Sequence, residues 1–310
     1  MPEEKFFKNI ICLIDKPEGL TSFQVLGRVK KLLGVKKIGH AGTLDKFASG
    51  LLVVGLNQGT KLLSYLVDDQ KRYLGTIKLG VSTETDDLYG DIMRQESFDH
   101  LREDSIREVI FALKGESWQR PPSFSALKIK GIRASDLARQ GEKLILAKRK
   151  IFISKLEILE IDLKEGRVIL DLTCSKGTYV RSLARDIGEK LGIGAHLEKL
   201  RRLGSGTFKI EQAVSLADLE NGARDRKIIE PKGFILSPEQ ALANFGLIII
   251  ADSAINKIKN GVFFQEDDII SLKKKEEQPF LIMTQDKILL AIAQVKIFEQ
   301  WEIEYLNVFR

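Results

Sequence analysis

The segment GHAGTLDKFASG at residues 39–50 constrains the fold more than any other stretch of this 310-residue chain. Its three glycines, Gly39, Gly42 and Gly50, interrupt a helix and are typical of turns and of close backbone approaches. The apolar run LLVVG that follows predicts a buried strand. We therefore expect Asp45 to lie on a loop that leads into this strand, a place where folds often carry functional groups. A solvent-exposed turn aspartate is the alternative at this point.

Positive charge is concentrated in residues 120–155, which carry ten Lys or Arg side chains and two acidic ones. This segment has a charge of +8, so the rest of the chain sums to −2 within an overall +6. A basic surface concentrated in this way favours a polyanionic partner, most commonly a nucleic acid. A solvated surface segment without a partner is the alternative.

Periodic apolar residues predict a mixture of helices and strands along the first two thirds of the chain. We expect helices over 21–34, 60–67, 104–115 and 178–192, a strand over 72–81, and a hairpin that turns at 165–166. Such a mixture is typical of an α+β fold in which helices flank a mixed, largely antiparallel sheet.

A domain boundary is expected near residues 231–246, where two prolines and two glycines separate patterned segments. Beyond it, short apolar runs alternate with polar turns, which predicts a small β-rich domain. The expected domains are therefore residues 1–245, with a basic insert at about 120–150, and residues 246–310.

Several function classes are excluded by what the sequence lacks. There is no P-loop, no HExxH or GxSxG motif and no metal-spaced Cys/His cluster, so we expect neither a cofactor nor a metal. The distant Cys12 and Cys174 favour a reducing, cytoplasmic setting. The N-terminal residues do not have the pattern of a signal peptide, and no apolar run approaches the roughly 18 residues of a membrane span. The chemistry would have to come from a carboxylate.

The segment GHAGTLDKFASGLLVVG (39–55) closely resembles the aspartate motif of the TruB family of tRNA pseudouridine synthases. Further segments resemble that family in the same order: LIDKPEGLTSFQV (13–25), KRYLGTIKLGVSTETDDLYG (71–90), QRPPSFSALKIKG (119–131), LARQG (137–141) and CSKGTYVRSLARDIGEKLGIGAHLEKLRRLGSGTF (174–208). The resemblance implies the pseudouridine synthase fold. The C-terminal segment INKIKNGVFF (255–264) is similar to small PUA-type RNA-binding domains.

Two positions depart from the family pattern. Lys46 stands where the family usually has proline, which would fix φ and stiffen the loop. Ser135 stands where a tyrosine is common in the insert. The first departure bears on the rigidity of the loop and the second on contacts with RNA.

The resemblance implies conversion of uridine 55 in the T loop of tRNA to pseudouridine, a reaction that gains no atoms and needs no cofactor. Asp45 would act as nucleophile or as general base, and these two routes stay open. Arg181 would keep the carboxylate ionised, and Tyr73 would stack on the extruded uracil. His40 would fill the gap that the base leaves, with packing inside the Gly-rich turn as the alternative.

Weaker assignments complete the implied site. Lys16 would shape the floor of the pocket, and Tyr179 and Leu197 would line it. RNA contacts are expected from the basic insert and its flank, at Lys128, Lys148, Arg149 and Lys150. The expected partner of this monomer is tRNA, bound at the T stem-loop and towards the acceptor stem. Since each candidate catalytic residue precedes residue 210, we expect the C-terminal domain to be dispensable for chemistry on an isolated T arm.

Three other functions remain open from the sequence. A non-catalytic tRNA-folding chaperone would use the same RNA-binding surface. A related synthase would modify ribosomal RNA, although the long basic extensions of such enzymes are absent. An enzyme acting on a small nucleotide is the third, and the +8 segment argues for a larger substrate.

Overall fold

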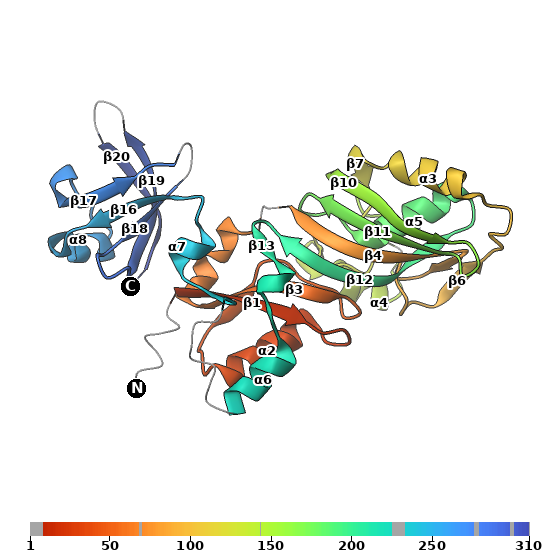
Figure 1. Cartoon of the computed structure of the whole chain (residues 1–310), viewed down its shortest axis with the longest axis horizontal. Helices are drawn as coiled ribbons and strands as arrows, with labels where there is room; N and C mark the ends of the chain where they lie inside the picture. The colour runs from red at the N-terminus through yellow and green to blue at the C-terminus, as the bar shows by residue number, and fades with distance from the viewer. Residues whose placement is uncertain are drawn as a thin grey trace.

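The computed structural model describes residues 9–67, 70–142, 144–224, 233–275, 279–297 and 301–309. Lys143 of the basic insert lies outside the described residues. Two separate sheets dominate the chain, and Figure 1 shows the C-terminal one as a distinct body beside the larger one. The expected α+β class is confirmed, with a mixed, largely antiparallel sheet and a separate C-terminal β-rich domain.

Eleven strands of the described chain form the larger sheet. Its main path runs β14 (Val214–Ser215), β1 (Asn9–Lys16), β3 (Ser49–Asn57), β12 (Ala195–Ser205), β4 (Lys71–Leu79), β11 (Arg167–Cys174), β10 (Arg149–Asp162) and β7 (Gly115–Gln119). Three short strands pair at its sides: β2 (Ile38–His40), β13 (Phe208–Lys209) and β15 (Ile235–Leu236). The pairs β1–β14 and β3–β12 are parallel, and the other pairs are antiparallel.

Two groups of helices cover this sheet. The α-helices of the described chain are α2 (Ser22–Leu32), α3 (Glu103–Phe111), α4 (Ala134–Arg139), α5 (Val180–Leu191), α6 (Leu216–Arg224), α7 (Pro238–Ala241) and α8 (Ile255–Lys259). Figure 1 shows α2 and α6 together beside β1 and β3, whereas α3 and α5 lie with the half built by β4, β11 and β10. Each group closes its own apolar core, because the buried faces of α2 and α5 belong to different clusters.

Most elements expected from the sequence are found. The helix expected over 21–34 begins after Thr21, whose side chain forms a capping box with Gln24. The strand expected over 72–81 is β4, and the hairpin expected around 165–166 is β10–β11.

The expected helix over 60–67 is instead two 3₁₀ turns, η1 (Gln58–Lys61) and η2 (Leu63–Tyr65). Gly59 packs so closely on Ile10 that a Cβ there would collide with the Ile10 backbone. The i→i+3 turns are tighter than α-helical turns, so the backbone of η1 can lie this close to Ile10 on β1.

Two small hairpins extend from the larger sheet. One pairs β5 (Val81–Thr83) with β6 (Ile92–Gln95), and the other pairs β8 (Lys128–Ile129) with β9 (Ile132–Arg133) inside the basic insert. The remaining 3₁₀ turns are η3 (Ile210–Gln212), η4 (Asp252–Ala254) and η5 (Glu266–Asp268). No helix among the described residues is long and apolar enough to cross a membrane.

The C-terminal sheet begins at Gly246. Its strands run in the order β17 (Ile269–Lys273), β16 (Gly246–Ile250), β18 (Phe280–Met283), β19 (Leu289–Ile297) and β20 (Trp301–Val308). The short apolar runs of the sequence become its buried strands, and α8 closes its own small core.

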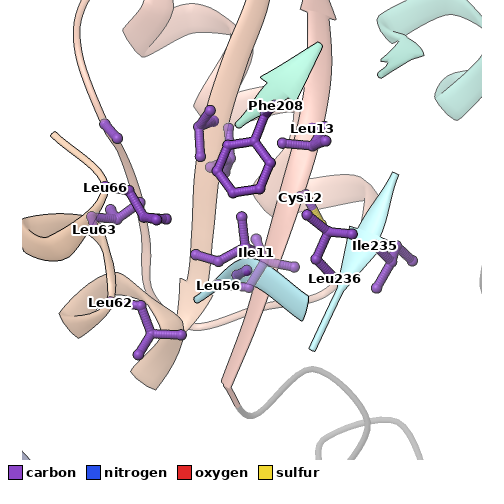
Figure 2. Packing of buried hydrophobic residues seen from close by; sticks show 14 of the residues in the cluster. Ile11, Cys12, Leu13, Leu56, Leu62, Leu63, Leu66, Phe208, Ile235 and Leu236 are labelled. Atoms are coloured by element: carbon purple, nitrogen blue, oxygen red, sulfur yellow. The ribbon is translucent and has the colours of Figure 1, made fainter. Parts of the chain in front are cut away.

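One apolar cluster contains side chains from both sheets. Figure 2 shows Ile11, Leu62 and Leu66 within this cluster, and five side chains from the C-terminal sheet and its end join it: Leu281, Met283, Leu289, Ile292 and Phe309. Polar contacts add to the contact surface, because Lys61 Nζ donates to Val308 O at 2.7 Å and Asn307 Nδ2 donates to the Tyr65 hydroxyl at 2.7 Å. This shared core argues against a dispensable C-terminal domain, since its removal would expose apolar side chains of β1 and η1–η2.

We expect Phe309→Ala to lower the free energy of unfolding of the whole chain by about 3–5 kcal/mol. Phe309 is 2% exposed and Lys61 Nζ lies 5.2 Å from its ring centre, so truncation leaves a cavity between the domains. Denaturant unfolding followed by tryptophan fluorescence measures the change. Phe23→Ala, at an 83% exposed position, is the control and should change it by less than about 0.5 kcal/mol. Separate unfolding of the C-terminal domain alone would contradict a shared core.

Candidate functional site

Asp45 lies on the loop between β2 and β3, as its sequence context predicts. The loop is held from helix α2 by Ser22, whose hydroxyl accepts from Leu44 N at 2.9 Å and donates to Leu44 O at 3.1 Å. Gly19 N donates to Lys46 O at 2.9 Å. The backbone on both sides of Asp45 is therefore fixed by the segment that precedes and opens α2.

The other side of the loop rests on β12. Gly50 has a φ of +105°, and a Cβ at this position would collide with the Arg202 backbone. Arg202 is completely buried, and it donates from Nε to Leu51 O at 2.6 Å and from Nη2 to Gly42 O at 3.2 Å. The parallel pairing of β3 and β12 therefore requires glycine at position 50. Arg202 bonds to Gly42 on one side of Asp45 and to Leu51 on the other, so it holds both ends of the Asp45 loop against β12.

Arg181, near the start of α5, holds the carboxylate of Asp45. Its Nε lies 3.0 Å from Asp45 Oδ2, and its Nη2 donates to Asp45 Oδ1 at 3.2 Å. Nη2 also donates to Phe124 O at 2.9 Å, and Nη1 donates to Thr85 O at 3.0 Å and to Asp87 Oδ2 at 3.3 Å. The guanidinium is almost fully buried, so these contacts fix its orientation and its charge faces Asp45.

The charges around Asp45 oppose one another. Burial raises the pKa of the Asp45 carboxyl above its usual value, and the negative charge of Asp87 adds to this. Arg181 acts most strongly in the other direction and lowers this pKa. Lys16 is completely buried near Asp45, and its Nζ donates to Pro17 O at 2.9 Å and to Leu20 O at 2.6 Å. Burial lowers the pKa of Lys16 to about 8, although the charge of Asp45 opposes this.

A cavity of about 440 Å³ opens over this pair of charges. The side chain of Asp45 is 38% exposed, so its carboxylate is accessible while Arg181 is not. One part of the wall is apolar or aromatic, with Tyr73, Leu200 and Val180. Basic side chains also line the cavity, among them Lys71, Arg133, Arg139 and Lys176. The cavity therefore combines one accessible carboxylate, an aromatic ring and several cations.

The structure brings four of the candidate residues into this cavity: Asp45, Tyr73, Tyr179 and Arg181. Leu197, expected at the wall, is completely buried, and Leu200 lines the cavity instead.

Two further candidates stand outside the wall. Lys16 lies below the loop and lines a second, smaller cavity beside Arg201. His40 is half-buried on β2, burial lowers its pKa, and its Nδ1 has no hydrogen-bond partner among the described residues.

The basic candidates of the insert and its flank lie outside the cavity. Lys128 and Lys148 are exposed, Lys150 Nζ lies 2.9 Å from Glu116 Oε2, and Arg149 is half-buried beside Gly177. Other residues of the insert line the cavity, among them Phe124, Arg133, Ser135 and Arg139.

Both departures from the family pattern are close to the site. Ser135 is part of the cavity wall, so a small hydroxyl stands where a tyrosine ring would project. Lys46 is exposed, and its Nζ lies 5.9 Å from the ring centre of Tyr89, a cation–π contact.

Sequence reasoning did not single out three residues that build this site: Ser22, Asp87 and Arg202. Each lies within a segment that resembles the family, at TS (21–22), TDD (85–87) and RR (201–202). A serine at a helix start, an acid beside another acid and an arginine in a strand are common in other settings. Their roles depend on partners more than 20 residues away, which a local pattern does not reveal.

Metal ligation is not supported among the described residues, where no group of three or more His, Cys, Asp or Glu side chains is placed to hold an ion. Cys12 and Cys174 are free and buried, and burial raises the pKa of Cys12 to about 12.

Comparison with known proteins agrees with this geometry. Residues 30–180 match the family model for the TruB family pseudouridylate synthase N-terminal domain, and residues 181–243 match the tRNA pseudouridylate synthase B C-terminal domain. The chain is 42% identical over 217 residues to a tRNA pseudouridine synthase B of Corynebacterium jeikeium, covering 68% of this chain and 70% of that protein. It is 40% identical over 250 residues to that of Geobacter sulfurreducens, covering 81% of each.

Two solved complexes contain a chain of the same fold. A Cbf5–Nop10–Gar1 complex matches with a TM-score of 0.72 and 29% identity, over 100% of this chain and 88% of that chain. An H/ACA RNP bound to a substrate RNA containing 2′-deoxyuridine matches with a TM-score of 0.71 and 27% identity, over 100% and 88%.

We expect Gly50→Ala to destabilise the protein by at least the roughly 1–3 kcal/mol of a strained backbone. The positive φ and the collision with Arg202 act in the same direction. Gly27→Ala is the control, since a Cβ on this helical glycine would meet nothing within 4 Å and should add about 0.5–1 kcal/mol of stability. Thermal unfolding of both variants measures the difference, and an unchanged melting temperature for Gly50→Ala would contradict the close approach.

Proposed function

The chain belongs to the TruB family of pseudouridylate synthases, and we propose that it isomerises the uridine at position 55 in the T loop of tRNA, with Asp45 as the catalytic carboxylate. It is a tRNA pseudouridine synthase, an isomerase. The observation that carries the assignment of Asp45 is its accessible carboxylate, held by the buried guanidinium of Arg181 at the base of a basic and aromatic cavity.

The reaction breaks the bond between N1 of uracil and C1′ of ribose, and it forms a bond between C5 and C1′. No atom is gained or lost overall. Asp45 acts either as a nucleophile or as the base that removes a ribose proton, and both routes need the ionised form. Arg181 favours that form because its positive charge opposes the effect of burial on the Asp45 pKa.

The target base has to leave the T loop to reach Asp45. Tyr73, on β4 in the cavity wall, supplies an aromatic face on which the extruded uracil stacks. Such stacking contributes about 1–3 kcal/mol per base. His40, half-buried on β2, would occupy the place that the base leaves in the T loop.

The surroundings of the cavity suit a polyanion. Arg133, Arg139 and Lys176 contribute positive charge to its wall, and Lys128 and Lys148 extend it over the exposed surface. We propose that these side chains neutralise phosphates of the T arm. The C-terminal domain, residues 246–310, would act as a PUA-like module that extends contact towards the acceptor stem.

A folding chaperone without catalysis would need the cavity but not the Asp45 carboxylate. A synthase for ribosomal RNA would need both, on another substrate. Incubation with a tRNA T stem-loop, a full tRNA and a ribosomal RNA fragment, followed by mapping of pseudouridine, separates these functions from the proposed one.

We expect Asp45→Asn to fold and bind tRNA but to lose almost all product formation. The change is nearly isosteric, yet it removes the nucleophile and the base together. Pseudouridine mapping at position 55 and tRNA binding are measured on the same preparation. Asp91→Asn, at an exposed position, is the matched control and should keep full activity. A comparable rate of isomerisation by Asp45→Asn would refute its catalytic role.

The rate should fall as the pH drops through the pKa of Asp45, because only the ionised form reacts. Burial places this pKa above the roughly 3.9 of a free aspartate, so the loss should begin at a higher pH than that value implies. Asp87→Asn removes a charge that raises the Asp45 pKa, so we expect the acid limb to move to lower pH. Single-turnover rates across the acidic and neutral range measure the limb, and a shift to higher pH would contradict the assigned electrostatics.

The double variant Lys128→Gln, Lys148→Gln should weaken tRNA binding and flatten its salt dependence. Removal of one phosphate contact reduces the slope of log affinity against log salt by about 0.7–0.9. Titrations at several salt concentrations measure the slope. Lys30→Gln, on the exposed face of α2, is the control. An unchanged slope in the double variant would place the phosphate contacts elsewhere.

A further inference from the structure

A second arginine lies one helical turn beyond Arg181 on α5. Arg185 does not line the cavity, and it is spaced so that both guanidinium groups leave the same face of the helix. Its Nη1 lies 2.9 Å from Asp86 Oδ2, and its Nη2 donates to Arg120 O at 2.8 Å. Arg185 therefore bridges the same two segments that Arg181 contacts, the loop at 84–90 and the start of the basic insert.

The start of the basic insert is bonded to α5 and its N-cap at three successive points. Gln119 exchanges hydrogen bonds with the backbone of Tyr179, at 2.8 Å from Tyr179 N and 3.1 Å to Tyr179 O. Arg185 holds the carbonyl of Arg120, and Arg181 holds the carbonyl of Phe124. Two buried prolines, at positions 121 and 122, lie between the last two points. Each proline restricts its own φ, so the chain between Arg120 and Phe124 has few conformations. Holding Arg120 O in place therefore also restricts the position of Phe124 O.

The loop at 84–90 carries Asp87, the other acidic partner of Arg181. Asp86 beside it has a φ of +60°, an uncommon conformation for a residue other than glycine. Its carbonyl accepts from Leu197 N at 3.0 Å, and its carboxylate points to Arg185. A strained conformation persists only where its surroundings hold it, and Arg185 does so together with Thr83, whose carbonyl accepts from Asp86 N at 3.2 Å and whose hydroxyl donates to Asp87 O at 2.6 Å.

The negative charges around Arg185 favour a positively charged side chain at this position. Three carboxylates face it: Asp86, Asp186 at 3.0 Å and Glu189 at 3.8 Å. Asp86 is buried, and burial raises its pKa to about 6 while Arg185 opposes this. Loss of the arginine would leave a buried carboxylate without its partner and free the carbonyl of Arg120.

We propose that Arg185 is a positioning residue of this enzyme, one that fixes the start of the basic insert and the Asp86–Asp87 loop so that Phe124 O and Asp87 orient Arg181 against Asp45. The inference rests on the proposed role of Asp45 as the catalytic carboxylate. Arg185 acts through Arg181 and touches no substrate.

The test compares Arg185→Gln, Asp86→Asn and the double variant with Arg107→Gln, which removes an arginine that has a single carboxylate contact on the surface of α3. We expect the single-turnover rate at saturating tRNA to fall about 10- to 100-fold in each single variant, since small misplacements of catalytic groups have effects of this size. The double variant should be little slower than the slower single variant, because both changes act through one contact. Arg107→Gln should keep the wild-type rate.

A second measurement reports on the insert without catalysis. Trypsin should cleave the Lys128–Arg139 stretch faster in Arg185→Gln than in Arg107→Gln, at a temperature where both remain folded. If Arg185→Gln unfolds, the nearly isosteric Asp86→Asn carries the test. Wild-type rates in both single variants, fully multiplicative losses in the double variant, or unchanged cleavage of the insert would each overturn the proposal. An active Asp45→Asn would instead refute the proposed function, and cleavage would still report on Arg185.

Discussion

The contact between Arg181 and Asp45 is the interaction on which the rest of the site depends. A carboxylate at the base of a cavity tends towards its neutral form, and a buried guanidinium without partners would be costly. The protein meets both demands with one arrangement. Arg181 faces Asp45 with two nitrogens and gives its remaining contacts to Thr85, Asp87 and Phe124. The loop at 84–90 and the basic insert thereby become part of the geometry that holds Asp45.

The strands serve this contact by placing residues far apart in sequence within a few ångströms. The parallel approach of β3 and β12 requires Gly50 and brings Arg202 beneath the Asp45 loop. The antiparallel pair β4–β12 puts Tyr73 opposite Arg202. The C-terminal domain also packs against these strands, because Phe309 and its neighbours belong to the apolar cluster around β1. The C-terminal sheet is thus packed on the half of the larger sheet that contains β1 and β3, the strand into which the Asp45 loop leads.

The site candidates differ in how far the sequence could place them. Asp45, Tyr73, Tyr179 and Arg181 were predicted, and the structure brings them to one cavity, whereas their catalytic and binding roles stay predictions. Leu197 was expected at the wall but is completely buried, and Leu200, on the same face of β12, lines the cavity instead. A bulge in the β4–β12 pairing lies between Leu197 and Lys199, and simple alternation along the strand does not reveal it.

The sequence by itself determined the fold class, the order of the main elements and the segment that carries the carboxylate, because turns, periodicity and caps are set by neighbouring residues. It also located the excess of positive charge. Only the tertiary structure decided which partners meet: Ser22 with Leu44, Arg202 with Gly42, Asp87 with Arg181 and Arg185 with Arg120. It likewise decided that the two domains share a core. These contacts join residues 22 to 160 positions apart, and such distances close only when the sheet has set its strand order and register.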